Sequence, residues 1–292
     1  MVLFSALRGG VLARFLGPVS EFGSIRGRVS MKKLTMCVFA AALAFVAATT
    51  CFAADSAWNG TWKENLAKSK LTGHHFVVTE KPGGMMHFSN GGPVSYDFAC
   101  DGKPYTTSPG QVLTCTGNPQ SGYDFTMSVN GHAVNKQHRT FSADGKEMIM
   151  KGTDYRADGS TADFSGVRKR EGSGTGLVGT WVQAEVQDQK PDVQTWSVKG
   201  DRLEIQSSVD KVTIDAKLDG SDSTVAGPNV PPGATLAIKP EGANKLRFER
   251  KLNGKLMNEE TYTLNADNKV MTEISWVPGR ETEKVTVVYE KQ

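Results

Sequence analysis

Short stretches in which apolar and polar residues alternate run through most of the chain. Residues 123–129 (YDFTMSV) alternate in this way, as do residues 246–252 (LRFERKL) and, more loosely, residues 286–291 (TVVYEK). A two-residue period is typical of half-buried β-strands. Asn-Gly, Asp-Gly and Pro-Gly pairs separate the runs and favour hairpin turns. No sustained helical period follows residue 53, so the pattern predicts an all-β protein.

The turn markers recur in the same order in the two halves of the chain. An Asn-Gly pair at 130–131 returns at 253–254, and a Gly-Thr-Trp triplet at 60–62 returns at 179–181. Several shared markers in one order indicate an internal repeat, in which each triplet opens one copy.

The repeat predicts two domains, over residues 57–171 and 177–292. Residues 172–176 (GSGTG) between them have the composition of a short flexible linker. About eight strands can be counted in each copy, the number that closes a small antiparallel barrel around side chains or one small ligand. We therefore expect an all-β fold of two tandem antiparallel up-and-down β-barrels of about eight strands each. Each copy is expected to fold independently.

The first 53 residues are expected to lie outside both barrels. Residues 31–53 combine a basic start, an apolar run and small residues before Ala54, which is the pattern of a secretory signal peptide. An uncleaved membrane anchor is the alternative, because the run is close to the minimum that spans a bilayer. Residues 1–30 are interpreted as an extension from a start codon assigned too early, without a stable fold; a long basic n-region is the alternative. The mature protein is then periplasmic or secreted, with no transmembrane segment.

Two cysteines remain after such a cleavage, Cys100 and Cys115. An even pair in an exported domain favours a disulfide. Both align with apolar residues of the second copy, so we expect both side chains to point inward from neighbouring strands.

Charge and motifs exclude several classes of function. The net charge of +3 favours neither nucleic acid nor an anionic membrane surface as a partner. No catalytic triad, phosphate-binding loop or paired-carboxylate motif is present, so no residue is nominated as catalytic and no cofactor is expected. His74 and His75, with Met85, Met86 and His87, invite a copper site, but adjacent strand residues face opposite ways. We therefore expect no metal.

The Gly-x-Trp motif at 60–62 resembles the signature of lipocalins. Residues 60–63 (GTWK) and 287–291 (VVYEK) resemble the opening and closing strands of fatty-acid-binding proteins, the other branch of the calycin group. Residues 60–71 (GTWKENLAKSKL) are still more similar to the lipocalin-like domains of uncharacterised secreted bacterial proteins.

This resemblance implies a structural role for the two tryptophans. In the group, the Trp plugs the closed end of the barrel and a basic residue of the last strand packs across it. Trp62 and Trp181 match the Trp, and Arg168 or Arg170 and Lys291 are the nearest basic candidates.

The arginine that fatty-acid-binding proteins carry two residues before the last-strand tyrosine is absent. Val287 precedes Tyr289 at that spacing, and Gly166 precedes Arg168 in the first copy. Binding of a long-chain acid is therefore not implied.

Polar residues fall where a barrel interior should be apolar. If residues 253–255 form a three-residue bulged hairpin loop, polar residues of both flanking strands share the inner face. A two-residue turn would instead send the polar residues of the second strand outward. Pairing of Arg250 with Glu260, or a position at the wet rim, is the other alternative. The candidate ligand-binding residues are Phe248, Arg250, Asn258, Glu260 and Tyr262, and in the first copy Phe125, Asn135, Gln137 and Arg139.

Two functions remain open. One is an exported binding protein that holds a small, partly apolar or amphiphilic molecule in one or both barrels. The other is a cell-envelope structural or protein-interaction module whose barrels are filled by their own side chains. An enzyme stays open without a nominated residue, and the pattern does not determine the oligomeric state.

The expected cleavage gives a first prediction. Mass-spectrometric sequencing of the exported protein should find its N-terminus near Ala54, because small residues precede that position. Peptides from residues 1–30 on the exported chain would contradict this interpretation.

Overall fold

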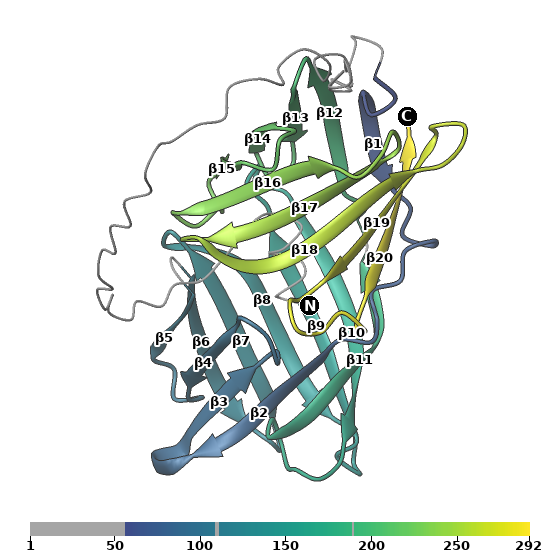
Figure 1. The fold of residues 1–292 in the computed structure, drawn as a ribbon. Helices are drawn as coiled ribbons and strands as arrows, with labels where there is room; N and C mark the ends of the chain where they lie inside the picture. The colour runs from purple at the N-terminus through teal and green to yellow at the C-terminus, as the bar shows by residue number, and fades with distance from the viewer. Residues whose placement is uncertain (1–55, 109–110, 189) are drawn as a thin grey trace, which may run out of the picture.

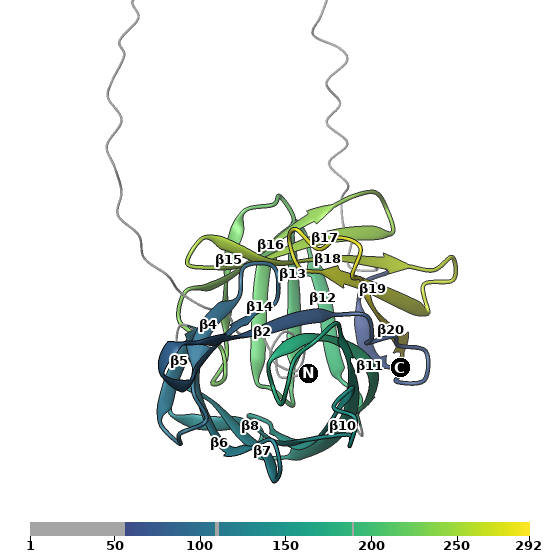
Figure 2. The same ribbon diagram turned by 90° about the horizontal axis from the view of Figure 1, so that it is seen from below.

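The computed structural model describes residues 56–108, 111–188 and 190–292, and almost all of the described chain is β-strand and turn (Figure 1). The expected signal peptide (31–53) and upstream extension (1–30) lie outside the described residues. The described strands form two antiparallel sheets, one a closed barrel and the other curled into a nearly closed one (Figure 2). The expectation of an all-β protein with two antiparallel barrels is confirmed. Within the described residues each sheet has ten strands rather than about eight.

The closed barrel, called here the C-terminal barrel, takes most of its strands from the second half of the chain. Its order is β1-β12-β13-β14-β15-β16-β17-β18-β19-β20, and β1 also pairs with β20 to complete the ring. Its strands are β1 (Gly60–Glu64), β12 (Val193–Lys199), β13 (Arg202–Ser207), β14 (Val212–Lys217), β15 (Asp222–Ala226), β16 (Ala234–Pro240), β17 (Lys245–Leu252), β18 (Lys255–Leu264), β19 (Val270–Trp276) and β20 (Val285–Lys291).

The second sheet, called here the N-terminal barrel, has the order β4-β3-β2-β11-β10-β9-β8-β7-β6-β5. Its strands are β2 (His75–Lys81), β3 (Met85–Ser89), β4 (Ser95–Phe98), β5 (Pro104–Ser108), β6 (Gln111–Asn118), β7 (Gly122–Val129), β8 (His132–Phe141), β9 (Glu147–Tyr155), β10 (Thr161–Glu171) and β11 (Gly179–Asp188), with a 3-10 turn η1 (Pro82–Gly84) between β2 and β3. Strands β4 and β5 are its two edges. The expected disulfide is present there, between Cys100 after β4 and Cys115 in β6.

The two barrels exchange their Gly-Thr-Trp strands. Strand β1, which opens the first copy, pairs with β12 and β20 of the C-terminal barrel. Strand β11, which opens the second copy, pairs with β10 and β2 of the N-terminal barrel. The boundaries expected from the repeat, 57–171 and 177–292, would keep each triplet with its own copy. The sheets instead cross those boundaries in both directions.

The likeness of the two copies explains why the exchanged strands fit. Trp62 and Trp181 are both 0% exposed, and each indole donates a hydrogen bond to the carbonyl four residues earlier, at 3.0 and 2.9 Å. Lys291 lies over the Trp62 ring at 5.1 Å, and Arg170 lies over the Trp181 ring at 4.1 Å. Each tryptophan therefore meets a basic residue of a last strand, but of the opposite copy. The two exchanged strands find equivalent surroundings.

The hairpin at residues 253–254 corrects one expectation. It is a two-residue Asn-Gly turn with both residues at positive φ, not a three-residue loop. The polar residues still face inward, because the register of β17 and β18 shifts between Arg250 and Lys251 and leaves Met257 as an extra residue. Such a β-bulge reverses the faces of the residues that follow it. The first copy carries the same Asn-Gly turn, and β7 and β8 shift register between Met127 and Ser128.

The strand exchange predicts which cysteine pairs can be cross-linked. Thr61 stands opposite Thr195, with the two hydroxyl oxygens 3.3 Å apart, so the double variant Thr61→Cys/Thr195→Cys should form a disulfide within one chain. The matched control is Thr61→Cys/Val77→Cys. Val77 pairs with Thr180, the counterpart of Thr61, so this control should stay reduced. Mass spectrometry after mild oxidation reads both. A cross-link in the control alone would mean that each strand stays with its own copy.

Candidate functional site

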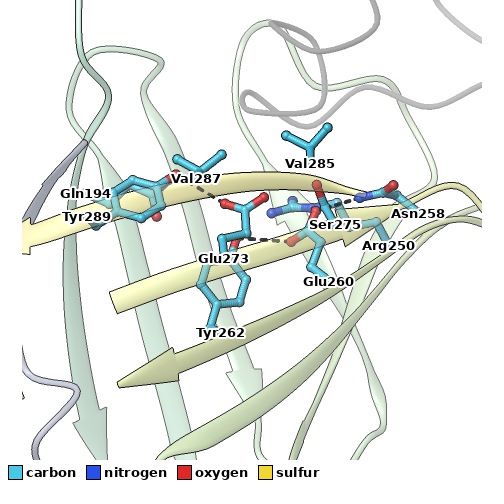
Figure 3. A pocket seen from close by; sticks show the side chains of 10 residues that line it. All are labelled: Gln194, Arg250, Asn258, Glu260, Tyr262, Glu273, Ser275, Val285, Val287 and Tyr289. Atoms are coloured by element: carbon cyan, nitrogen blue, oxygen red, sulfur yellow. Dashed lines mark hydrogen bonds and ion pairs between the residues drawn. The ribbon is translucent and has the colours of Figure 1, made fainter. Parts of the chain in front are cut away.

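The interior of the C-terminal barrel contains a network of charged and polar side chains around Glu260, which forms an ion pair with Arg250. The Arg250 Nε donates to a Glu260 oxygen at 2.5 Å, and the Asn258 amide donates to the same oxygen at 3.0 Å. The Tyr262 hydroxyl donates to the other oxygen at 3.1 Å, as Figure 3 shows. Glu260 is 2% exposed, so its charge is stabilised by these donors rather than by bulk water.

A second carboxylate, Glu273, extends the network. The Tyr289 hydroxyl donates to it at 3.3 Å from the neighbouring strand (Figure 3). Burial acts to lower the pKa of Arg250, but the charge of Glu260 outweighs this and holds that pKa above its ordinary value. Burial, with the charges of Glu260 and Glu273, raises the pKa of Tyr262, so this phenol stays a neutral donor.

The cavity beside this network is small. Its volume is about 20 Å³, which is room for about one water molecule. Its lining consists of Gln194, Arg250, Asn258, Glu260, Tyr262, Glu273, Ser275, Val285, Val287 and Tyr289. Arg250, Asn258, Glu260 and Tyr262, nominated as ligand-binding from the sequence, thus lie together, and Phe248 packs against Tyr262 with ring centroids 4.5 Å apart. They form the resident Arg250–Glu260 ion pair that was the alternative interpretation.

The nominated residues of the N-terminal barrel also come together. The Gln137 amide donates to Asn135 at 3.1 Å, and its oxygen accepts from the Arg139 Nε at 3.0 Å. The Arg139 guanidinium lies over the Phe125 ring at 4.0 Å. Asn135 in turn donates to Asp154 at 2.6 Å. No described carboxylate forms an ion pair with Arg139, so its charge is not matched as that of Arg250 is.

Arg168 is a functional candidate that the sequence interpretation assigned elsewhere. The family resemblance implies that Arg168 or Arg170 packs over a tryptophan, and Arg170 occupies that position. The Arg168 guanidinium instead lies over the Phe76 ring at 4.4 Å, and the residue is 9% exposed. Its buried Nε has no hydrogen-bond partner in the described chain. Residues two apart on a strand share a face, so the inward position of Arg170 was the signal that could have placed Arg168 inside.

Corresponding positions of the repeat show how the two interiors diverged. Gln137 stands opposite Phe125 as Glu260 stands opposite Phe248, so an amide replaces the central carboxylate. Arg139 occupies the position of Tyr262 on the neighbouring hairpin strand.

The same exchange of charge continues on the next strands. Met150 stands opposite Arg139 where Glu273 stands opposite Tyr262. Arg168 stands opposite Met148 as Tyr289 stands opposite Met271, so a second arginine replaces a second tyrosine. The carboxylates Glu260 and Glu273 are therefore lost, Met127 stands in the place of Arg250, and two guanidinium groups are gained where the other copy has tyrosines.

Burial affects the ionisation of this group of residues. Burial, and to a smaller extent the nearby charge of Arg139, lowers the pKa of Arg168 to about 9. It also lowers the pKa of Arg139 to about 10. Burial raises the pKa of Tyr96 to about 12, against the opposing influence of both arginines. At neutral pH both guanidinium groups are charged and the Tyr96 phenol is neutral.

The histidines are not gathered into a metal site. Among the described residues no group of three or more His, Cys, Asp or Glu side chains is placed to hold a metal ion. His75 lies between Glu283, at 3.1 Å, and Glu171, at 3.4 Å, and His87 contacts Asp97 at 2.6 Å. The same part of the chain contains no helix long and apolar enough to cross a membrane.

Comparison with known proteins does not identify the chain. No family model matches it, and no curated protein matches it. Among solved structures it is similar to one from a study of two prolyl endopeptidases, at 12% identity over 70% of this chain and with a TM-score of 0.14. The chain spans 40% of that chain's length. At this TM-score, the match supports no statement about the fold or the function of this protein.

The network predicts that Arg250 stabilises the fold. Arg250→Met should lower the free energy of unfolding by about 3 kcal/mol, because it leaves the Glu260 carboxylate buried and unpaired. The double variant Arg250→Met/Glu260→Gln should recover most of this loss, because both charges are then gone. Urea denaturation followed by circular dichroism measures both. A single variant as stable as the parent would show that the ion pair contributes little.

Proposed function

We propose that this protein is an exported binding protein that holds a small, partly apolar molecule inside its N-terminal barrel. The observation that carries the proposal is Arg168, a guanidinium 9% exposed, set among apolar side chains and without a hydrogen-bond partner in the described chain. An unpaired buried charge is costly, and interiors usually provide it with a partner. A bound molecule would be that partner.

The surroundings of Arg168 support an adaptable apolar pocket. Met127, Met148 and Met150 belong to the buried cluster of this barrel. Methionine side chains are flexible and polarisable, so they adjust to ligands of different shape. The aromatic residues of the cluster are Phe76, Phe88, Phe98, Phe125, Tyr123 and Trp181.

The C-terminal barrel favours the second candidate function, for its own half of the molecule only. Its cavity of about 20 Å³ and its paired charges are features of a barrel filled by side chains. We propose that the C-terminal barrel has a structural role. It pairs with β1 of the first copy, and β11 of the second copy in return completes the binding barrel.

Export is part of the same proposal. The pattern of residues 31–53 supports a periplasmic or secreted location, and the Cys100–Cys115 disulfide is compatible with it.

A matched pair of variants tests the assignment to one barrel. Met148→Trp and Met271→Trp place the same bulk at corresponding buried positions, opposite Arg168 and Tyr289. The neutral dye Nile red should bind the parent and Met271→Trp alike, and Met148→Trp at least about tenfold more weakly, because only there is the pocket filled. Fluorescence titration measures binding, and circular dichroism confirms that both variants fold. Absence of Nile red binding to the parent, or equal weakening by both variants, would contradict the proposal.

A further inference from the structure

Three polar groups of the N-terminal barrel converge without a carboxylate between them. Arg139 comes from β8, Arg168 from β10 and Tyr96 from β4, so they belong to separate parts of the sheet.

Aromatic rings link the three groups. Arg168 lies over Phe76, Phe76 stacks on Phe88, and Phe88 stacks on Tyr96 with ring centroids 4.7 Å apart. On the other side, Phe98 packs against both Tyr96 and Phe125, and Arg139 lies over Phe125. The charges of both arginines act on the Tyr96 phenol, in agreement with this geometry. The Tyr96 hydroxyl forms no hydrogen bond with another described residue.

The stacking of both arginines leaves their donors available. Each guanidinium lies over an aromatic ring, Arg139 over Phe125 and Arg168 over Phe76. A ring that covers the flat face does not occupy the N–H groups, which point outward in the guanidinium plane. Arg139 uses only its Nε, toward Gln137, and Arg168 donates no hydrogen bond to a described residue. Several N–H donors therefore remain for a ligand.

The charge of this cluster is +2 and is not neutralised locally. Burial lowers the pKa of the neighbouring His74 to about 3, so it adds no charge at neutral pH. The interior carboxylate of Asp154 belongs to another level of the barrel. Asp154 stands opposite Asn135, whereas Arg139 stands opposite Met150. The two pairs are four residues apart along the strands, which is about 13 Å at the rise of an extended chain.

We propose that Arg139, Arg168 and Tyr96 form the binding site for a doubly charged anionic head group, that of a phosphate monoester carrying an apolar tail. This inference rests on the proposed function, since the tail occupies the methionine-lined interior. A phosphate monoester has close to two negative charges at neutral pH and three terminal oxygens. The two guanidinium groups match the two negative charges, and with the phenol they provide one donor group for each of the three oxygens. Guanidinium groups bind phosphate oxygens through paired hydrogen bonds. A carboxylate would neutralise only one of the two charges.

Three ligands with the same tail test the head group. Octyl phosphate, octanoate and octanol are titrated into the whole protein by isothermal calorimetry, after removal of any co-purified molecule on a hydrophobic resin. Octyl phosphate should bind at least about tenfold more tightly than octanol, with octanoate between them. Arg139→Met and Arg168→Met should each abolish this preference and leave octanol binding unchanged. The control variant Arg250→Met/Glu260→Gln, in the other barrel, should keep it.

Thermal unfolding separates a ligand site from a structural role. Without ligand, Arg168→Met should melt at the parent's temperature or higher, because it removes an uncompensated buried charge; a lower melting temperature would show that Arg168 stabilises the fold. Octyl phosphate binding no tighter than octanol, or octanoate binding as tightly as octyl phosphate, would overturn the head-group assignment and leave the apolar pocket standing. Failure of all three ligands and of Nile red to bind would overturn both proposals.

Discussion

The pairing of β1 with β12 and β20 is the constraint on which both barrels depend. It closes the C-terminal barrel and buries Trp62, while β11 takes the corresponding place beside β2 and buries Trp181. Burial of a large apolar side chain contributes roughly 1.5–3 kcal/mol, so each strand is held firmly in the other half's sheet. The Gly-Ser segment 172–176 therefore joins two neighbouring strands of one barrel, β10 and β11, and the two barrels are interleaved rather than separable at this segment.

The two barrels also close differently, and the disulfide lies where closure is incomplete. The C-terminal barrel has no free edge in the described chain, whereas β4 and β5 end the other sheet without pairing with each other. Cys100 and Cys115 join the chain after β4 to β6, and the Gly102 N–H donates to the Cys115 carbonyl at 2.9 Å. A cross-link of this span is worth roughly 3 kcal/mol in the chain-entropy model. A covalent bond thus strengthens the barrel that lacks a continuous ladder.

The same architecture surrounds two opposite electrostatic interiors. In one, Arg250 forms an ion pair with Glu260, an amide and a phenol also donate to this carboxylate, and the cavity beside them holds about one water. At the corresponding positions of the other copy, Gln137 lacks the charge, and Arg139 and Arg168 replace tyrosines. In one interior the arginine is paired with a carboxylate, and in the other two arginines have no ion-pair partner among the described residues. This difference is why we assign ligand binding to the N-terminal barrel alone.

Local patterns determined the strands, the turns, the duplication and the cysteine pair, because alternation, Asn-Gly pairs and repeated triplets depend on short-range chemistry. They also brought Arg250 and Glu260 to one face, although the bulge at Met257 rather than a three-residue loop does so. Only the tertiary structure decided which copy each Trp strand completes, because both strands open with the same Gly-Thr-Trp triplet and this local pattern does not specify a partner strand. The tertiary structure also decided which of the interior arginines has a carboxylate partner. That depends on side chains from non-adjacent strands such as β4, β8 and β10, which no sequence period relates.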